Sequence, residues 1–322
     1  MEFSPVLCKF NPMRWVTFFS LFVFFPVLLF GQFYFGKNKI QYSDYRWEVF
    51  STEHFDVFFY DGEKELASFI AAVAESSYRE HSIRFRFYPS CRIPLIIYHT
   101  PNLFQETNTI PYILPEGVGG FTEYLKGRVV VPYNGSWADM EHTIRHELVH
   151  IFQLYYTEKM LDKNNVFYFS WLPLWFIEGQ AEHLSEDDRF EMEMFLRSGI
   201  LEGGFVPMTS LEEYSGSFLM YKEGEGFLQY LGQRFGEDVV IELVASCWEE
   251  KSFYERFEEV FGLPFEKVAD DWELYLKHRY FPLTPSGLLP KEWGKMLFTK
   301  GLVSSPRVVR SDSAYYLSLI HI

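Results

Sequence analysis

Two histidines and a glutamate stand close together near the middle of the chain, in the order His146-Glu147-Leu148-Val149-His150. On a helix, positions i and i+4 lie on one face, so both imidazoles can point at one metal ion. A glutamate directly after the first histidine is suited to act as a general base on a water at the metal. Chance alone produces these three fixed positions on the order of a few per cent of the time, so the motif needs further support.

Glu178 is the candidate for a third ligand, because a catalytic zinc ion takes three protein ligands and keeps one position open. The 27 residues between His150 and Glu178 are enough for a loop and a returning antiparallel helix. Glu182 lies one turn beyond Glu178 and is placed to accept an N–H from a ligand histidine, which fixes the tautomer of that ring. The alternative of a solvated acidic face is weakened by the apolar neighbours of both glutamates. A purely structural zinc site would usually close all four positions with cysteine and histidine.

The residues around the histidines predict a helix from Trp137 to about Thr157, with Ser136 as its N-cap. At 100° per residue the two histidines fall on one side of this helix, together with Asp139 and Thr143. One face therefore packs into a core and the other faces a cleft, which suits ligands better than core histidines. The apolar residues predicted on the core face are Met140, Ile144, Leu148, Ile151, Phe152 and Tyr155.

The remaining pattern predicts an α+β fold, since strands come first and helices follow. We expect a loop over residues 159–172, a second helix from Pro173 through Leu184, and several more helices between Glu186 and Tyr280. The elements expected before the zinc motif are a strand over Phe55–Tyr60, a helix over Glu63–Arg86, a strand over Ile93–His99, and a hairpin of Gly117–Tyr124 with Arg128–Pro132.

The segment HELVH followed by WFIEGQAEHLS resembles the gluzincin metallopeptidases. More closely, the chain is similar to the peptidase MA-like family of secreted bacterial proteins over about residues 34–280, including the segments EGVGGFTEYLKGRVVVP and GEGFLQYLGQRFGED. The resemblance implies a zincin-like fold with one Zn²⁺ held by His146, His150 and Glu178. It also implies zinc-dependent hydrolysis of peptides or proteins with Glu147 as the general base.

The resemblance further implies a substrate strand and an oxyanion-stabilising side chain. In gluzincins an edge strand beside the cleft binds the peptide as an added β-strand, and residues Gly119, Gly120, Phe121 and Glu123 are the candidates. An ordinary hairpin with a bulge fits the same residues equally well. For the oxyanion group Tyr221 is preferred, with Tyr214 and His183 as alternatives.

The net charge limits the kinds of partner, and the N-terminal residues indicate where the protein is located. The net charge of −15 argues against a nucleic-acid partner, because phosphate binding needs a basic surface. Residues 1–31 read as a signal peptide, with Lys9 and Arg14 before the apolar run from Trp15 to Phe30. An uncleaved anchor is the alternative. No later stretch is long and apolar enough to span a membrane. The signal peptide leads us to expect a secreted or periplasmic protein of the bacterial envelope. Cys91 and Cys247, the cysteines beyond the signal, could form a disulfide or stay thiols.

The predicted organisation is a signal peptide over 1–31, a peptidase domain over 32–282, and a tail over 283–322. Within the domain, 32–135 form an α/β part and 136–282 a helical part with the zinc site. The tail reads as a linker and one hairpin, and SSPRVVRSDSAYYLS resembles the start of a TolB-type β-propeller blade, as in longer members of the family. The alternative function is that of a zincin scaffold, non-catalytic or zinc-bound, which serves as a binding or assembly module for a propeller-containing envelope protein.

Overall fold

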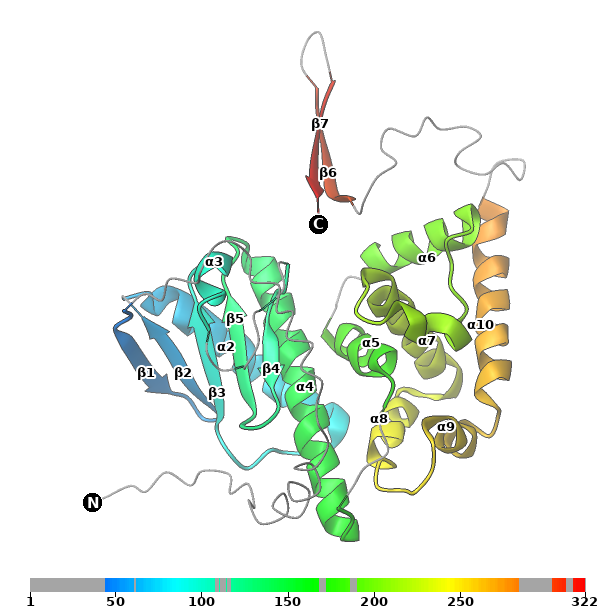
Figure 1. Cartoon of the computed structure of the whole chain (residues 1–322), viewed down its shortest axis with the longest axis horizontal. Helices are drawn as coiled ribbons and strands as arrows, with labels where there is room; N and C mark the ends of the chain where they lie inside the picture. The colour runs from blue at the N-terminus through cyan, green and yellow to red at the C-terminus, as the bar shows by residue number, and fades with distance from the viewer. Residues whose placement is uncertain are drawn as a thin grey trace, which may run out of the picture.

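The structure is a computed structural model that describes residues 44–283 except 61, 108–109, 111–113, 115–116, 168–171 and 186–189, and the backbone of two strands near the C-terminus. Its architecture is α+β, as predicted, with a mixed sheet and helices followed by a mainly helical half (Figure 1). The signal peptide expected over 1–31 and the linker after residue 283 lie outside the described residues. The domain boundaries stay predictions.

Among the described residues of the N-terminal half, five strands form one sheet in the order β1-β2-β3-β5-β4. The three inner strands are parallel, whereas β1 and β4 pair antiparallel at the two edges. The strands are β1 (Trp47–Ser51), β2 (Phe55–Tyr60), β3 (Ile93–Tyr98), β4 (Phe121–Glu123) and β5 (Arg128–Pro132). The predicted strands and hairpin are confirmed. β1 was not predicted, because its apolar residues Trp47 and Val49 are exposed and show no buried face.

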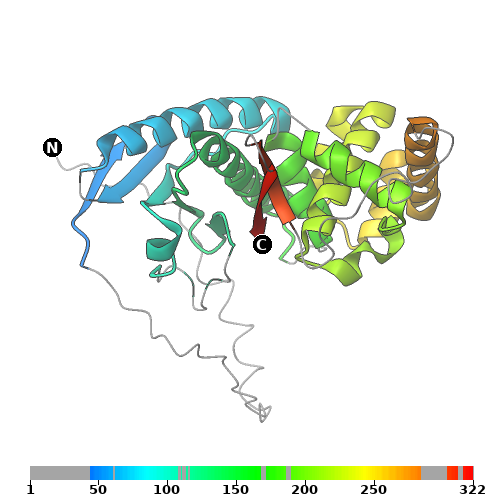
Figure 2. The same ribbon diagram turned by 90° about the horizontal axis from the view of Figure 1, so that it is seen from above.

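Helices α2 (Lys64–Phe85) and α4 (Trp137–Asn164) cover one face of this sheet (Figure 2). Because side chains alternate along a strand, Val129 and Val131 of β5 pack against these helices while Val130 faces the opposite side. There it joins a smaller cluster that includes Phe104 of the short helix α3 (Pro101–Phe104). The alternation fixes which face of each strand can reach α4.

Helix α4 begins after Ser136, whose Oγ accepts from the Asp139 amide, as the capping pattern predicts. It runs to Asn164 and ends at Asn165, which takes a left-handed conformation with φ 55°. The prediction of a loop over residues 159–172 is therefore wrong for residues 159–164, which are helical. Residues 159–164 (KMLDKN) contain good helix formers and no glycine or proline, so the helix continues until Asn165 allows it to stop.

The C-terminal half packs around its own aromatic core, which includes Trp175, Phe227 and Trp272. None of its helices, nor any other in the described part of the chain, combines the length and apolar character needed to cross a membrane. The elements are α5 (Leu174–Ser185), α6 (Phe190–Glu202), the 3₁₀ helix η2 (Met208–Tyr214), α7 (Phe218–Phe235), α8 (Glu237–Ala245), α9 (Phe253–Phe261), α10 (Phe265–Tyr280) and the 3₁₀ turn η3 (Phe281–Leu283).

The remaining expectations concern the tail and the cysteines. The predicted hairpin is present as the antiparallel strands β6 (Val303–Arg310) and β7 (Tyr315–His321), and its assignment to a propeller blade stays a prediction. Cys91 and Cys247 are both free thiols, and Cys247 is buried. Of the two possibilities left open for this pair, the structure therefore shows the unbridged one.

Helices α5 and α7 cross at two glycines, Gly179 and Gly224, which allow the backbones to touch. A Cβ on Gly179 would lie 2.6 Å from the carbonyl carbon of Gly224, and one on Gly224 would lie 2.5 Å from the Trp175 oxygen. Real Cβ atoms do not approach backbone this closely, so only glycine fits. The crossing holds the acidic side chains of α5 against the first turns of α7.

We expect Gly224→Ala to lower the free energy of unfolding more than Gly226→Ala does. A Cβ at Gly226 would also meet an atom at 2.5 Å, but that atom is the tip of the Leu196 side chain, which can move. Both changes gain the same helix propensity, so their difference reports the rigid backbone clash at Gly224, about 1–3 kcal/mol for overpacking. Urea unfolding of both variants measures it, and equal stabilities would contradict the rigid crossing.

The buried carboxyl of Glu223 on α7 is expected to make the stability of the protein depend on pH. Its side chain is buried, Oε1 accepts from the Val206 amide at 3.1 Å, and Oε2 meets no hydrogen-bond partner among the described residues. Burial raises the pKa of Glu223 to about 8. Below pH 4.5 the carboxyl is neutral in both states; as pH rises toward 8, only the unfolded chain ionises, so stability falls.

Glu223→Gln removes this titration and is expected to flatten the decline. The stability of the variant relative to the wild type should rise by about 3 kcal/mol between pH 4.5 and pH 7. Urea unfolding of both proteins at the two pH values gives this difference directly. A difference that stays constant with pH would mean that Glu223 is ionised in the folded protein at neutral pH.

Candidate metal centre

His146 and His150 lie one turn apart on α4, on the side opposite the apolar residues that pack against the sheet. Glu178, on the first part of α5, points its carboxylate at both rings. The Nε2 atoms of the two histidines are 3.3 Å apart, and Glu178 Oε2 lies 3.4 Å from His146 Nε2 and 3.3 Å from His150 Nε2. These three atoms form a nearly equilateral triangle of donors that could hold a metal ion.

The size of this triangle fits zinc. Bond lengths of about 2.0–2.1 Å at a tetrahedral angle put neighbouring ligand atoms roughly 3.3–3.4 Å apart, and the observed sides are 3.3 to 3.4 Å. The donors are two imidazole nitrogens and one carboxylate oxygen, a set that zinc accepts. Three protein donors leave one tetrahedral position open, and Glu178 is partly exposed.

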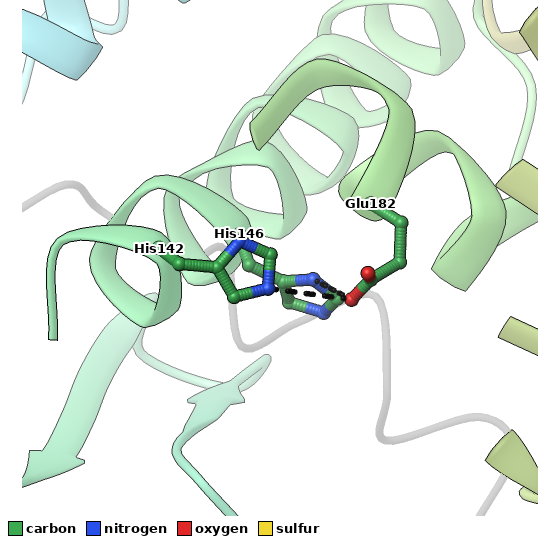
Figure 3. A group of neighbouring side chains, drawn as sticks. All are labelled: His142, His146 and Glu182. Atoms are coloured by element: carbon green, nitrogen blue, oxygen red, sulfur yellow. Dashed lines mark ion pairs between the residues drawn. The ribbon is translucent and has the colours of Figure 1, made fainter. Parts of the chain in front are cut away.

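A second group shares His146 and consists of His142, His146 and Glu182 (Figure 3). Its geometry is looser, since Glu182 Oε1 lies 3.0 Å from His146 Nδ1 but 3.7 Å from His142 Nε2. The other oxygen of Glu182 already contacts the ammonium of Lys222 at 2.7 Å. A cation between these residues would face Lys222, so the group suits the support of His146 better than the binding of a separate ion.

A third group consists of Glu53, His54 and Glu75 and shares no residue with the other two. His54 Nδ1 is hydrogen-bonded to Glu75 Oε2 at 2.7 Å, and the Glu53 side chain is 80% exposed and 3.9 Å away. The pairing of His54 with Glu75 explains this group without a metal ion, and its third member is exposed.

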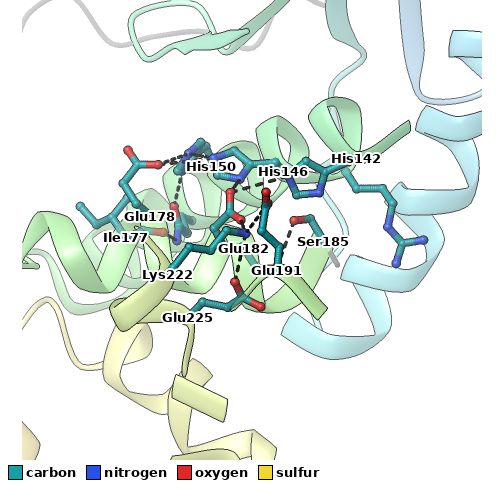
Figure 4. A network of polar contacts seen from close by, with 12 residues as sticks. His142, His146, His150, Ile177, Glu178, Glu182, Ser185, Glu191, Lys222 and Glu225 are labelled. Carbon is teal, nitrogen blue, oxygen red and sulfur yellow. Dashed lines mark hydrogen bonds and ion pairs between the residues drawn. The ribbon is translucent and has the colours of Figure 1, made fainter. Parts of the chain in front are cut away.

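The carboxylate of Glu182 connects His146 to buried charges on α7 (Figure 4). Lys222, which is buried, lies between Glu182 Oε2 at 2.7 Å and Glu225 Oε2 at 3.3 Å. The contact between Glu182 and His146 Nδ1 is short but poorly aligned as a hydrogen bond. Glu182 therefore lies beside His146 Nδ1, and its predicted role in fixing the tautomer stays a prediction. Lys222 supplies the buried positive charge that offsets the carboxylates.

The electrostatics of the triangle favour a cation. Burial works against a charged ring at His146, but Glu178 and Glu182 outweigh it and raise its pKa to about 10. Burial likewise opposes ionisation of Glu178, yet the two histidines hold the pKa of this carboxyl well below its usual range. Without a metal ion the site therefore draws protons onto its histidines, which indicates a place of strongly negative potential.

Glu147 is buried on the same helix and is held from the sheet side. Its Oε2 lies 2.8 Å from the hydroxyl of Thr122 in the edge strand β4. Gly120, just before β4, lies so close that a Cβ there would meet Thr143 at 2.9 Å and the Glu147 carboxylate at 3.3 Å. Burial raises the pKa of Glu147. The candidate base therefore lies between the edge strand and the histidine pair.

Two of the four candidate substrate residues lie beside the site, and the side chains of the other two make contacts elsewhere. Gly119 and Gly120 lie against Thr143 and Glu147, beside the site. Phe121 packs against Phe104 on the opposite face of the sheet, with ring centroids 5.5 Å apart. The side chain of Glu123 is engaged in the hairpin, where it accepts from the amides of residues 125 and 126 and from the guanidinium of residue 128.

Of the three oxyanion candidates, the structure brings only Tyr221 to the metal group. Its ring stacks on His146 with centroids 6.3 Å apart, and burial together with the Glu178 carboxylate raises its pKa above the ordinary value. Tyr214 is 45% exposed in η2. The Nε2 of His183 lies 2.9 Å from Glu237 of α8, so this ring is engaged elsewhere.

The sequence did not predict three contacts at the site: Thr122 with Glu147, Gln153 with His150, and Lys222 with Glu182. For each of these residues the sequence contains a weak indication of its unusual position. Thr122 alternates with Phe121 and so faces the other side of the sheet. Gln153 is a polar residue three positions after His150 on a buried helix. Lys222 directly follows the apolar run Phe218–Tyr221. None of these signals identifies the partner, which comes from another element of the fold.

No family model matches the chain, and no curated protein matches its sequence. The function must therefore be inferred from the donor triangle, the buried glutamate beside it and the strand that touches this glutamate.

Proposed function

We propose that the protein is a zinc-dependent peptidase that binds one Zn²⁺ through His146 Nε2, His150 Nε2 and Glu178. The observation that carries the proposal is the donor triangle with sides of 3.3 to 3.4 Å, next to the buried Glu147. The likeness of the two motif segments to gluzincins, and to the peptidase MA-like family, supports the same function and a zincin-like arrangement of the α+β fold.

When bound, zinc supplies a Lewis acid that polarises a carbonyl and makes a water more acidic. Glu147 takes the proton of the attacking water and delivers it to the leaving amine. Thr122 holds one carboxylate oxygen of Glu147 at 2.8 Å, which leaves the other oxygen for the proton. Tyr221, kept protonated by its raised pKa, donates to the carbonyl oxygen as negative charge develops there.

The substrate would bind along β4 as an added strand. β4 is an edge strand, so one side of its backbone has no partner within the described sheet. Main-chain hydrogen bonds to such an edge fix a peptide without reading most of its side chains. Gly119 and Gly120 let the peptide backbone come close to Glu147. The proposed place of action is the cell envelope or the exterior, to which a signal peptide over residues 1–31 would direct the chain.

Zinc content and hydrolysis test the proposal together. The full chain is purified, its zinc is quantified by mass spectrometry, and cleavage of a peptide library is followed by mass spectrometry of the products. One zinc per chain with defined cleavage products is expected. Absence of stoichiometric zinc binding would contradict the proposal. Zinc without any cleavage would favour a zinc-bound binding or assembly module.

A further inference from the structure

Gln153 lies at the junction between the two helices that carry the proposed ligands. It is buried on α4, one turn beyond His150, and its Oε1 lies 2.8 Å from His150 Nδ1. Its Nε2 donates to the backbone oxygen of Ile177 at 3.0 Å and to Gln180 Oε1 at 2.9 Å, both on α5. The side-chain amide is therefore satisfied at both ends by separate elements.

The contacts on α5 fix the orientation of this amide. A backbone carbonyl oxygen can only accept, so the atom of Gln153 that faces Ile177 must be the NH₂ group. The atom that faces His150 is then the carbonyl oxygen, which also can only accept. His150 Nδ1 must therefore carry a hydrogen, and a neutral His150 ring has its lone pair on Nε2, the atom that points into the donor triangle.

The same side chain also sets the distance between the ligands. Ile177 directly precedes Glu178, so the bond from Gln153 to the Ile177 oxygen ties the ligand-bearing turn of α5 to α4 next to His150. This tie and the orientation of His150 depend on one rigid amide, which cannot shift toward one partner without leaving the other. Buried polar side chains in proteins nearly always have hydrogen-bond partners, and the amide of Gln153 has them at both ends.

We propose that Gln153 is a positioning residue for the zinc site, which directs the His150 lone pair at the metal and holds α4 at the correct distance from Glu178. The inference rests on the proposed function for its consequence on zinc affinity. Its structural part, the His150 Nδ1–H donated to Gln153, stands without a metal ion.

The test compares three variants. Gln153→Leu removes both ends of the amide and is expected to weaken zinc binding about 10–100-fold, as loss of a partner of a ligand histidine usually does. Gln153→Glu keeps an oxygen that accepts from His150 and loses the donors to α5, so its affinity should fall less than about tenfold. Gln233→Leu is the matched control, since Gln233 is exposed on α7, and it should bind zinc like the wild type.

Zinc affinity is measured by competition with a chromophoric chelator. In parallel, ¹H–¹⁵N spectra of the metal-free chain labelled with ¹⁵N-histidine monitor the ring N–H of His150. A slowly exchanging Nδ1–H is expected in the wild type and in Gln153→Glu, and it should be absent from Gln153→Leu. A general loss of folding would not spare the glutamate variant in this way.

Two results would overturn the inference. One is wild-type zinc affinity in Gln153→Leu; the other is an equal loss in Gln153→Glu and Gln153→Leu, which would assign to Gln153 only the structural tie to α5. If the wild type binds no zinc, the proposed function fails instead, and the protected Nδ1–H of His150 still decides whether Gln153 orients the ring.

Discussion

Glu147→Gln is expected to slow peptide hydrolysis by about 10²–10⁴-fold, the usual contribution of a general base, while the chain still binds one zinc. The amide has nearly the same shape and can still contact the Thr122 hydroxyl, which lies 2.8 Å from the carboxylate, but it cannot accept a proton from water. Hydrolysis is measured on a peptide that the wild type cleaves, with zinc content determined on the same preparations.

Glu141→Gln is the matched control, because Glu141 lies on the same helix and is exposed. It should hydrolyse the peptide at the wild-type rate. If Glu147→Gln keeps wild-type activity, the proton is taken by another group and the assignment of the base is wrong. Loss of zinc together with activity would instead show that Glu147 serves the metal site itself.

His150→Ala is expected to lower zinc affinity by more than the 10–100-fold that supporting residues contribute, and to abolish hydrolysis. The physical reason is that it removes one of only three protein donors, whose mutual distances of 3.3 to 3.4 Å define the site. Competition with a chelator gives the affinity. The same loss is expected for Glu178→Ala.

His142→Ala separates the two overlapping groups. His142 belongs to the looser group and lies 3.7 Å from Glu182, so its removal should leave zinc binding nearly unchanged. If His142→Ala loses zinc while His150→Ala retains it, the ion occupies the group of His142, His146 and Glu182, and the proposed ligand set must be abandoned.

Much of the candidate site could be predicted because local rules determine it. A period of 3.6 residues puts His146 and His150 on one side of a helix and its apolar stripe on the other, and the α+β order follows from the succession of patterns. The strand containing Thr122 was predicted as well. In each of these cases the relevant interaction lies within one element or between neighbours in the sequence.

The contacts of Lys222 and Gln153 could not be predicted, because they join elements that are distant in the sequence and belong to neither motif segment. Lys222 reaches Glu182 across 40 residues, and Gln153 reaches the Ile177 oxygen across 24. The position of Lys222 depends on the crossing of α5 and α7 at Gly179 and Gly224. A sequence pattern marks each of these residues as unusual, but only the packed helices show which partner it meets.

The position of a zinc ion in crystals of the full chain tests the central claim most directly. Anomalous diffraction data collected on both sides of the zinc absorption edge should show one peak, about 2.0–2.1 Å from the Nε2 atoms of His146 and His150 and bonded to Glu178. A peak between His142 and Glu182, or no peak in crystals grown with zinc, would contradict it.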